Sequence, residues 1–444
     1  MEEVKSRNVH PVDEMLPVGH LFAFGLQHVL AMYAGAVAVP IILAGALHLT
    51  TAQLIQLINA DLFTCGIATL IQTIGFRGVG AKVPMIQGVT FAAVSPMIII
   101  GTDFGLTGIY GSIIIAGLVT FLMAGSFSKL IRFFPPVVTG TIITIIGTTL
   151  MPVAVRWISG PNPKAADYAS MERILLAAVT MLFVILIYRF GKGFTKNIAV
   201  LIALILGTIV AYATGMANFG EVAKASWFDV VTPFAFGYPE FYPSAIFSMI
   251  IVMLVVMVET TGDLIAIGEI VDKKVDQGLL ARCLRADGLS TAIGGILNSF
   301  PYTAFAQNVG LVAVTGIRSR FVVATSGVIL IVLGLFPKLA AVVACIPQPV
   351  LGGAGVAMFG MIIASGIRSL AKVEFEGTYN LMVIAISFGF GLITLAVPNF
   401  YHAFPEWFRV IMHSGITAAS VCAVLLNVLF NGVPADEKKI QDSE

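Results

Sequence analysis

Five ionisable side chains lie inside long apolar runs of this sequence, where a charge is costly and usually faces a cavity or a partner. They are His28, Asp61, Glu259, Asp263 and Asp287. Glu259 and Asp263 are four residues apart, so a helix places them on one face about one turn apart. The spacing predicts a carboxylate cluster that binds and releases a proton. The alternative for Asp263 is a solvated position at the cytoplasmic end of its helix.

Two short polar stretches carry a second chemical signal. Residues 87–96 read QGVTFAAVSP and residues 299–310 read SFPYTAFAQNVG. Each is typical of an extended stretch that leads into a half-helix, whose free N–H groups point at the bilayer midplane. The Gln307 amide can form two hydrogen bonds with the edge of a planar amide-like ring, while Phe91 stacks on its face. We expect Asn308 to cap its helix and also to brace the site.

The composition requires membrane elements to position these groups. The 444 residues are 58% hydrophobic and 11% charged, which excludes a soluble globular protein. A net charge of +1 gives no sign of a nucleic-acid partner. We predict an all-α polytopic protein in the lipid bilayer with fourteen spans, the third and tenth of them partly extended. The spans are 18–38, 51–74, 88–102, 106–126, 135–155, 172–190, 197–215, 242–264, 279–298, 302–316, 320–345, 349–367, 378–397 and 407–431.

Lys and Arg residues predict the orientation of the chain. When the loops between spans are assigned alternately to the two sides of the membrane, all but six of the 25 Lys and Arg residues lie on one side. The positive-inside rule assigns that side to the cytoplasm. Both termini are then cytoplasmic in an integral plasma (inner) membrane protein, and residues 1–17 show no cleavable signal pattern. The six exceptions are Arg156, Lys164, Arg173, Lys224, Lys338 and Arg409.

An internal repeat agrees with this topology. Pro136-Val137-x-x-Gly140 recurs as Pro349-Val350-x-x-Gly353, and Gly125-x-Phe127-x-Lys129-Leu130 recurs as Gly334-x-Phe336-x-Lys338-Leu339. Seven predicted spans separate the copies, so the second half is inverted relative to the first. Inverted repeats of this kind are typical of secondary transporters.

The sequence also resembles a known family. Residues 307–316 match the Q-N-x-G-x-x-x-x-T-G signature of the nucleobase-ascorbate transporters, also called nucleobase:cation symporter-2 proteins, in its xanthine and uric acid version. The supporting matches lie in the family's order: Gln27-His28, Gly88-x-Thr90-Phe91, Glu259-x-x-Gly262-Asp263 and Arg285-Ala286-Asp287-Gly288.

This resemblance implies two inverted seven-span repeats divided between a core and a gate domain. The core comprises residues 18–134 (spans 1–4) and 239–346 (spans 8–11), and the gate comprises 135–238 (spans 5–7) and 347–431 (spans 12–14). Residues 1–17 and 432–444 are the cytoplasmic ends. The resemblance further implies a homodimer that takes up substrate with protons.

The site residues follow from the same resemblance by position. Substrate would be bound by Glu259, Gln307, Phe91, Thr90, and the backbone of Phe305 and Ala306, with Asp287, His28, Asn308 and Asp263 supporting the site or coupling. Gln307 favours an oxidised purine, since pyrimidine-type relatives generally carry Glu there. Thr90 resembles urate-accepting relatives and Asp263 xanthine-accepting ones, which together indicate use of both.

The leading hypothesis is therefore a proton-coupled importer of xanthine, uric acid or both, working by alternating access of core against gate. The alternatives are an anion exchanger of the sulfate-transporter-like fold, or a permease for uracil or another nucleobase. An enzyme is not expected, because no spacing supplies a nucleophile with its base or a set of metal ligands. We expect no cofactor, and sodium in place of the proton stays open as the coupling ion.

Overall fold

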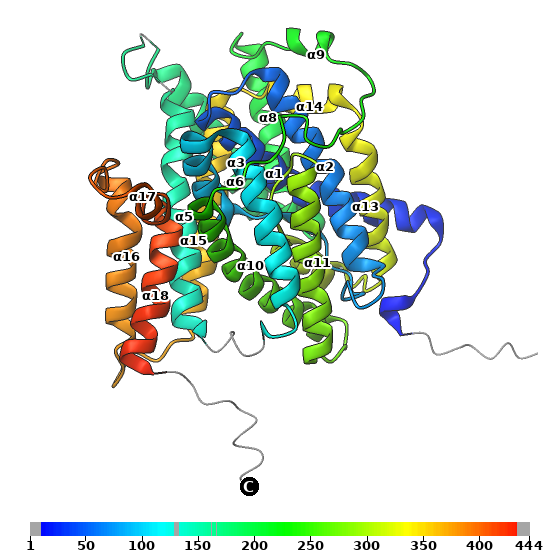
Figure 1. The fold of residues 1–444 in the computed structure, drawn as a ribbon. Helices are drawn as coiled ribbons and strands as arrows, with labels where there is room; N and C mark the ends of the chain where they lie inside the picture. The colour runs from blue at the N-terminus through cyan, green and yellow to red at the C-terminus, as the bar shows by residue number, and fades with distance from the viewer. Residues whose placement is uncertain (1–9, 128–132, 161, 166, 433–444) are drawn as a thin grey trace, which may run out of the picture.

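The computed structural model describes residues 10–127, 133–160, 162–165 and 167–432. Lys129 and Leu130 of the repeat lie outside these residues, as do most of the two predicted terminal segments. Figure 1 shows an almost entirely helical molecule in which the helices form one bundle.

Seven helices of the described residues are long and apolar enough to cross a membrane: α1 (Val18–Ala46), α2 (Thr51–Thr73), α3 (Val94–Met123, with the short η2 turn Phe91–Ala93 before it), α5 (Pro136–Ser159), α6 (Met171–Phe190), α10 (Pro243–Ile270) and α15 (Gln348–Leu370). The remaining long elements are α8 (Ala199–Ala213), α11 (Gln277–Ile296), α12 (Ala306–Thr315), α13 (Arg320–Gly334), α16 (Asn380–Ala396) and α18 (Gly415–Asn431). Short pieces complete the chain: η1 (Pro11–Asp13), α7 (Phe194–Asn197), α9 (Gly220–Lys224), α14 (Pro337–Ala344) and α17 (Glu406–His413). The protein is an integral, multi-span membrane protein.

The prediction of one continuous span over 320–345 is wrong. The chain bends by 82° between α13 and α14. Pro337 has no N–H to donate and disfavours a helical residue before it, and Phe336 accordingly leaves the helical region with φ −114° and ψ 85°. The long apolar run at 320–345 concealed this break.

The extended stretches expected in the third and tenth segments are confirmed. They are β1 (Gln87–Val89) and β2 (Tyr302–Ala304), which pair antiparallel. The predicted boundary between the third and fourth segments coincides with Gly105, whose φ of 73° interrupts α3. Glycine adopts this left-handed conformation without a steric penalty, so the helix changes course there.

Small residues let the central helices approach closely. A Cβ at Gly117 of α3 would lie 2.5 Å from the main-chain nitrogen of Ala292 in α11, and a Cβ at Gly288 of α11 would lie 2.5 Å from that of Phe121 in α3. Membrane helices commonly associate through such small residues, because lipid gives apolar side chains no extra reason to cluster. Any larger side chain at either glycine would separate the pair.

Candidate functional site

The paired strands bring together segments more than 200 residues apart in the sequence. Gln87 lies opposite Ala304 and Val89 opposite Tyr302. The ladder continues at both ends, where Thr90 N donates to Pro301 O at 3.0 Å and Phe305 N donates to Ile86 O at 3.2 Å. Buried backbone groups in a bilayer must be satisfied within the protein, and this pairing satisfies the facing edges of two non-helical stretches.

Threonine side chains from the surrounding helices satisfy the outer edges. Gln87 N donates to the Thr69 hydroxyl of α2 at 3.1 Å, and Tyr302 N donates to the Thr291 hydroxyl of α11 at 3.0 Å. The Thr260 hydroxyl of α10 lies 3.4 Å from Ala304 N and 3.1 Å from the Thr303 hydroxyl. Sequence reasoning missed these threonines, whose only signal is a hydroxyl residue within an apolar helix.

Two glycines make room for the ring of Phe305. A Cβ at Gly35 of α1 would lie 2.7 Å from Cζ of Phe305 and 4.0 Å from Cε2 of Phe91, and a Cβ at Gly88 would collide with the Phe305 ring. Phe91 and Phe305, one from each polar stretch, therefore both reach α1. Phe305 is buried, whereas Phe91 is half-buried and so retains an accessible ring.

The start of α12 is open. Ala306 and Gln307 are exposed, and no side chain caps the helix, which follows Phe305. Among the described residues, the Gln307 amide forms no hydrogen bond, so its donor and acceptor are free. Asn308 is buried, and its Nδ2 donates to the main-chain carbonyl of His28 at 2.9 Å and lies 3.1 Å from His28 Nδ1. Asn308 therefore braces α12 against α1, but the prediction that it caps α12 is wrong, because no side chain caps that helix. In the other polar stretch the Thr90 hydroxyl caps the η2 turn, accepting from Ala92 N at 3.1 Å.

The carboxylates predicted from the sequence gather beside these strands. Glu259 and Asp263 of α10 are half-buried, and the Asp263 carboxylate lies within electrostatic range of both Glu259 and Asp287. Asp287 of α11 is fully buried, facing the Thr260 hydroxyl and the Gln87 amide. Neither oxygen of Asp287 forms a hydrogen bond of good geometry with a partner in the described part of the chain. An unpaired carboxylate buried in this way requires a proton or a cation.

Comparison with known proteins decides the family. Residues 19–400 match the family model Xan_ur_permease, which is described as "Permease family". The chain is 45% identical over 423 residues to "Xanthine permease" of Bacillus subtilis (strain 168), covering 95% of this chain and 96% of that one. It is 44% identical over 445 residues to "Uric acid transporter UacT" of Escherichia coli (strain K12), covering 99% and 92%. The chain belongs to the nucleobase-ascorbate transporter family.

A solved structure shows the same fold. The transmembrane domain of the cyanobacterial bicarbonate transporter BicA is matched with a TM-score of 0.60 at 14% identity, over 95% of this chain and 98% of that one. At this sequence identity, the similarity shows a shared fold and nothing about the substrate. As a member of a permease family, the protein is a transporter and not an enzyme.

This member of the nucleobase-ascorbate transporter family also has a buried acidic residue to which the sequence analysis gave no role in the site. Asp61 of α2 is fully buried, and its Oδ1 accepts hydrogen bonds from the Tyr302 hydroxyl at 3.0 Å and the Ser299 hydroxyl at 3.2 Å. The Cys65 thiol lies 3.7 Å from the same oxygen. Asp61 thereby holds β2 through the side chains of Tyr302 and Ser299.

Proposed function

We propose that this permease imports xanthine, uric acid or both by proton symport. The observation that carries the proposal is that the exposed Gln307 amide and the half-buried Glu259 carboxylate form no hydrogen bond among the described residues, while their helices α12 and α10 contact each other. These groups can bind the amide edges of an oxidised purine. The names of the relatives support the same substrates.

The substrate is held as a flat ring with hydrogen bonds at its edge. Glu259 and Gln307 bind the purine, the accessible ring of Phe91 stacks on it, and Ala306 supplies a backbone N–H, because the N–H of Phe305 already donates to Ile86 O. Thr90 caps the turn that begins at Phe91 and so sets the position of the ring. A planar site with paired donors and acceptors rejects rings that lack the matching edge, because its polar groups would then stay unpaired.

Proton coupling uses the carboxylate cluster. Protonation at Glu259, Asp263 or Asp287 removes repulsion against an anionic purine and neutralises an unpaired buried carboxylate. His28 and Asn308 hold the second half-helix in place while this occurs. Sodium bound by Asp287 is the competing possibility for the coupling ion, and the test below separates the two.

The transport cycle moves a core (residues 18–134 and 239–346) against a gate (135–238 and 347–431), which are built from two inverted seven-span repeats and which we expect to assemble as a homodimer. The packing of the helices supports the repeat, because equivalent helices of the two halves form equivalent contacts. The helix α5 packs against its own equivalent, α15. The α2–α13 contact has its counterpart in α11–α3, and the α6–α8 contact has its counterpart in α16–α18. The α5–α6 connection, α9 and α14 lie at one end of the molecule in Figure 1, and the described chain begins and ends at the other, which supports termini on one side of the membrane. The distribution of Lys and Arg assigns that side to the cytoplasm, and the membrane that we propose is the inner membrane.

The proposal is tested by uptake of labelled xanthine into cells that lack their own purine carriers, with urate, uracil and hypoxanthine as competitors. We expect competition by urate and loss of accumulation on addition of a protonophore. Dependence on external sodium, with no effect of the protonophore, would overturn proton coupling. Competition by uracil but not by urate would favour the pyrimidine alternative.

A further inference from the structure

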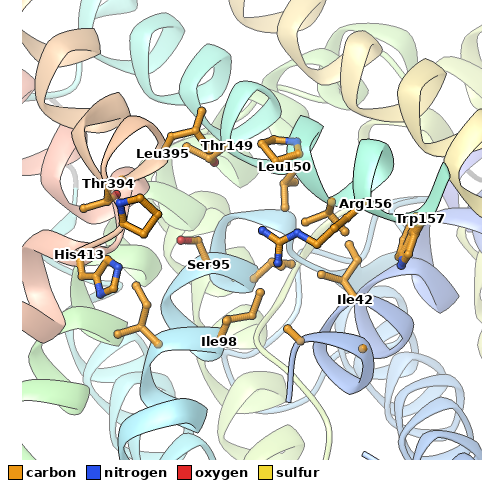
Figure 2. Close-up of a pocket in the computed structure, with 18 of the residues that line it drawn as sticks. Ile42, Ser95, Ile98, Thr149, Leu150, Arg156, Trp157, Thr394, Leu395 and His413 are labelled. Carbon is orange, nitrogen blue, oxygen red and sulfur yellow. The ribbon is translucent and has the colours of Figure 1, made fainter. Parts of the chain in front are cut away.

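A cavity separate from the candidate substrate site lies where α1 and α3 of the proposed core meet α5, α15 and α16 of the proposed gate. It has a volume of about 410 Å³ and is formed by α1, α3, α5, the start of α15, α16 and the α17–α18 region. None of the ten predicted site residues lines it. Figure 2 shows the Arg156 side chain of α5 extending into the space between Leu150 and Ile98.

The lining suits a flat organic anion. Arg156 is exposed to the cavity, no Asp or Glu lines it, and no carboxylate of the described residues pairs with the guanidinium. The hydroxyls of Ser95, Thr149 and Thr394 add hydrogen-bonding groups between apolar walls. Pockets for small molecules commonly combine such walls with a few placed polar groups.

Other charges near the cavity do not cancel that of Arg156. His413 lines the wall across from it (Figure 2). The Asp103 carboxylate lies within electrostatic range of His413, but it already pairs with Arg409 at 3.5 Å. Arg156 therefore carries the cavity's unpaired positive charge, and its planar guanidinium matches two acceptors side by side.

A row of aromatic rings connects this cavity with the candidate substrate site. Trp157 lines the cavity, its ring centroid lies 6.5 Å from that of Phe359, and Phe359 meets the half-buried Phe91 edge-on at 6.1 Å. Phe359 is fully buried between the two. The rings thus fill the interval between the cavity and the ring that we assign to substrate stacking.

We propose that this cavity is an entry site, in which Arg156 binds the anionic form of the purine before the ring passes Phe359. The inference rests on the proposed function and deepens it. Arg156 precedes the α5–α6 connection, at the end of the molecule away from the described termini (Figure 1), which is the outer end under the topology proposed above. An exposed cation at such an entrance raises the local concentration of an anion.

The test compares KM and maximal rate of urate uptake in wild type, Arg156→Gln, Arg156→Lys and Lys164→Gln, each corrected for the amount of protein in the membrane. Lys164→Gln is the matched control, because it removes a positive charge from the loop that follows α5 without touching the cavity. We expect KM to rise about tenfold in Arg156→Gln with the maximal rate retained, a smaller rise in Arg156→Lys, and no change in Lys164→Gln.

Ionic strength gives a second readout. Added salt should raise the urate KM of wild type, because it screens Arg156, and should leave that of Arg156→Gln unchanged. An unchanged KM in Arg156→Gln, or a fall in maximal rate at constant KM, would overturn the entry site while wild-type uptake continues. Failure of wild type to transport any purine would instead overturn the proposed function.

Discussion

The side-chain amide of Asn308 donates to the main-chain carbonyl of His28 at 2.9 Å, so α12 is tied to α1 through an acceptor that every residue type at position 28 would supply. The imidazole adds a second contact, with Nδ1 3.1 Å from the same amide nitrogen. The two bonds join segments 280 positions apart. The tie therefore depends more on Asn308 than on His28.

Asn308→Ala should impair the protein more than His28→Ala. The alanine at 308 removes both hydrogen bonds, each worth about 0.5–1.5 kcal/mol, whereas the alanine at 28 keeps the bond to the main-chain carbonyl. Thermal unfolding of the purified protein in detergent, together with uptake per molecule, measures both effects. An equal loss of stability in the two variants would contradict this ranking.

Glu259→Gln should abolish or uncouple accumulation of substrate. The amide keeps the size of the side chain and its capacity to accept a hydrogen bond, but it cannot take up a proton. Glu269→Gln is the matched control, since Glu269 is exposed near the end of the same helix. Uptake driven by an imposed pH gradient in vesicles is the measurement, and unchanged pH-driven uptake in Glu259→Gln would rule out this mechanism.

Gln307→Glu should lower the affinity for urate by about tenfold or more. The substitution removes a donor from the edge of the site and adds a negative charge that repels an anionic ring. Gln277→Glu makes the same change at an exposed position at the start of α11 and should have no effect. Inhibition constants for urate against labelled xanthine report the change, and equal constants in wild type and Gln307→Glu would remove Gln307 from the site.

Gly35→Ala should reduce transport through the ring of Phe305. The added methyl group would lie 2.7 Å from Cζ of Phe305, so the ring has to move and to displace the start of α12. Adding Phe305→Leu to Gly35→Ala should restore part of the uptake, since the smaller side chain leaves room. Gly19→Ala, with no atom within 4 Å of the added group, is the control on the same helix. Failure of Phe305→Leu to restore any activity would argue against this contact.

The sequence predicts the two half-helices because their polar stretches stand out against apolar surroundings and recur at a fixed offset. It also identifies Glu259, Asp287 and Gln307 as unusual groups for a membrane interior. Other features depend on tertiary placement and have no local pattern. The row formed by Phe91, Phe359 and Trp157 is one example, because each of these residues is an ordinary aromatic side chain in its own segment.

The hydrogen bonds of Thr69 and Thr291 to the backbone could not be predicted from the sequence either. Their hydroxyls accept from the first N–H of β1 and of β2, a role that appears only once the strands are placed beside α2 and α11. The bend at Pro337 is different, since the proline is visible in the sequence and only the surrounding apolar run favoured a continuous helix.

The pairing of β1 with β2 also constrains how the chain is made. When the ribosome has synthesised the first third of the protein, the backbone of Gln87, Gly88 and Val89 has no strand beside it, because the partner lies at Tyr302, Thr303 and Ala304. Those amides cannot stay unsatisfied in hydrocarbon. The nascent N-terminal half must therefore keep this segment in water, or shield it with other proteins, until more than two thirds of the polypeptide has entered the bilayer.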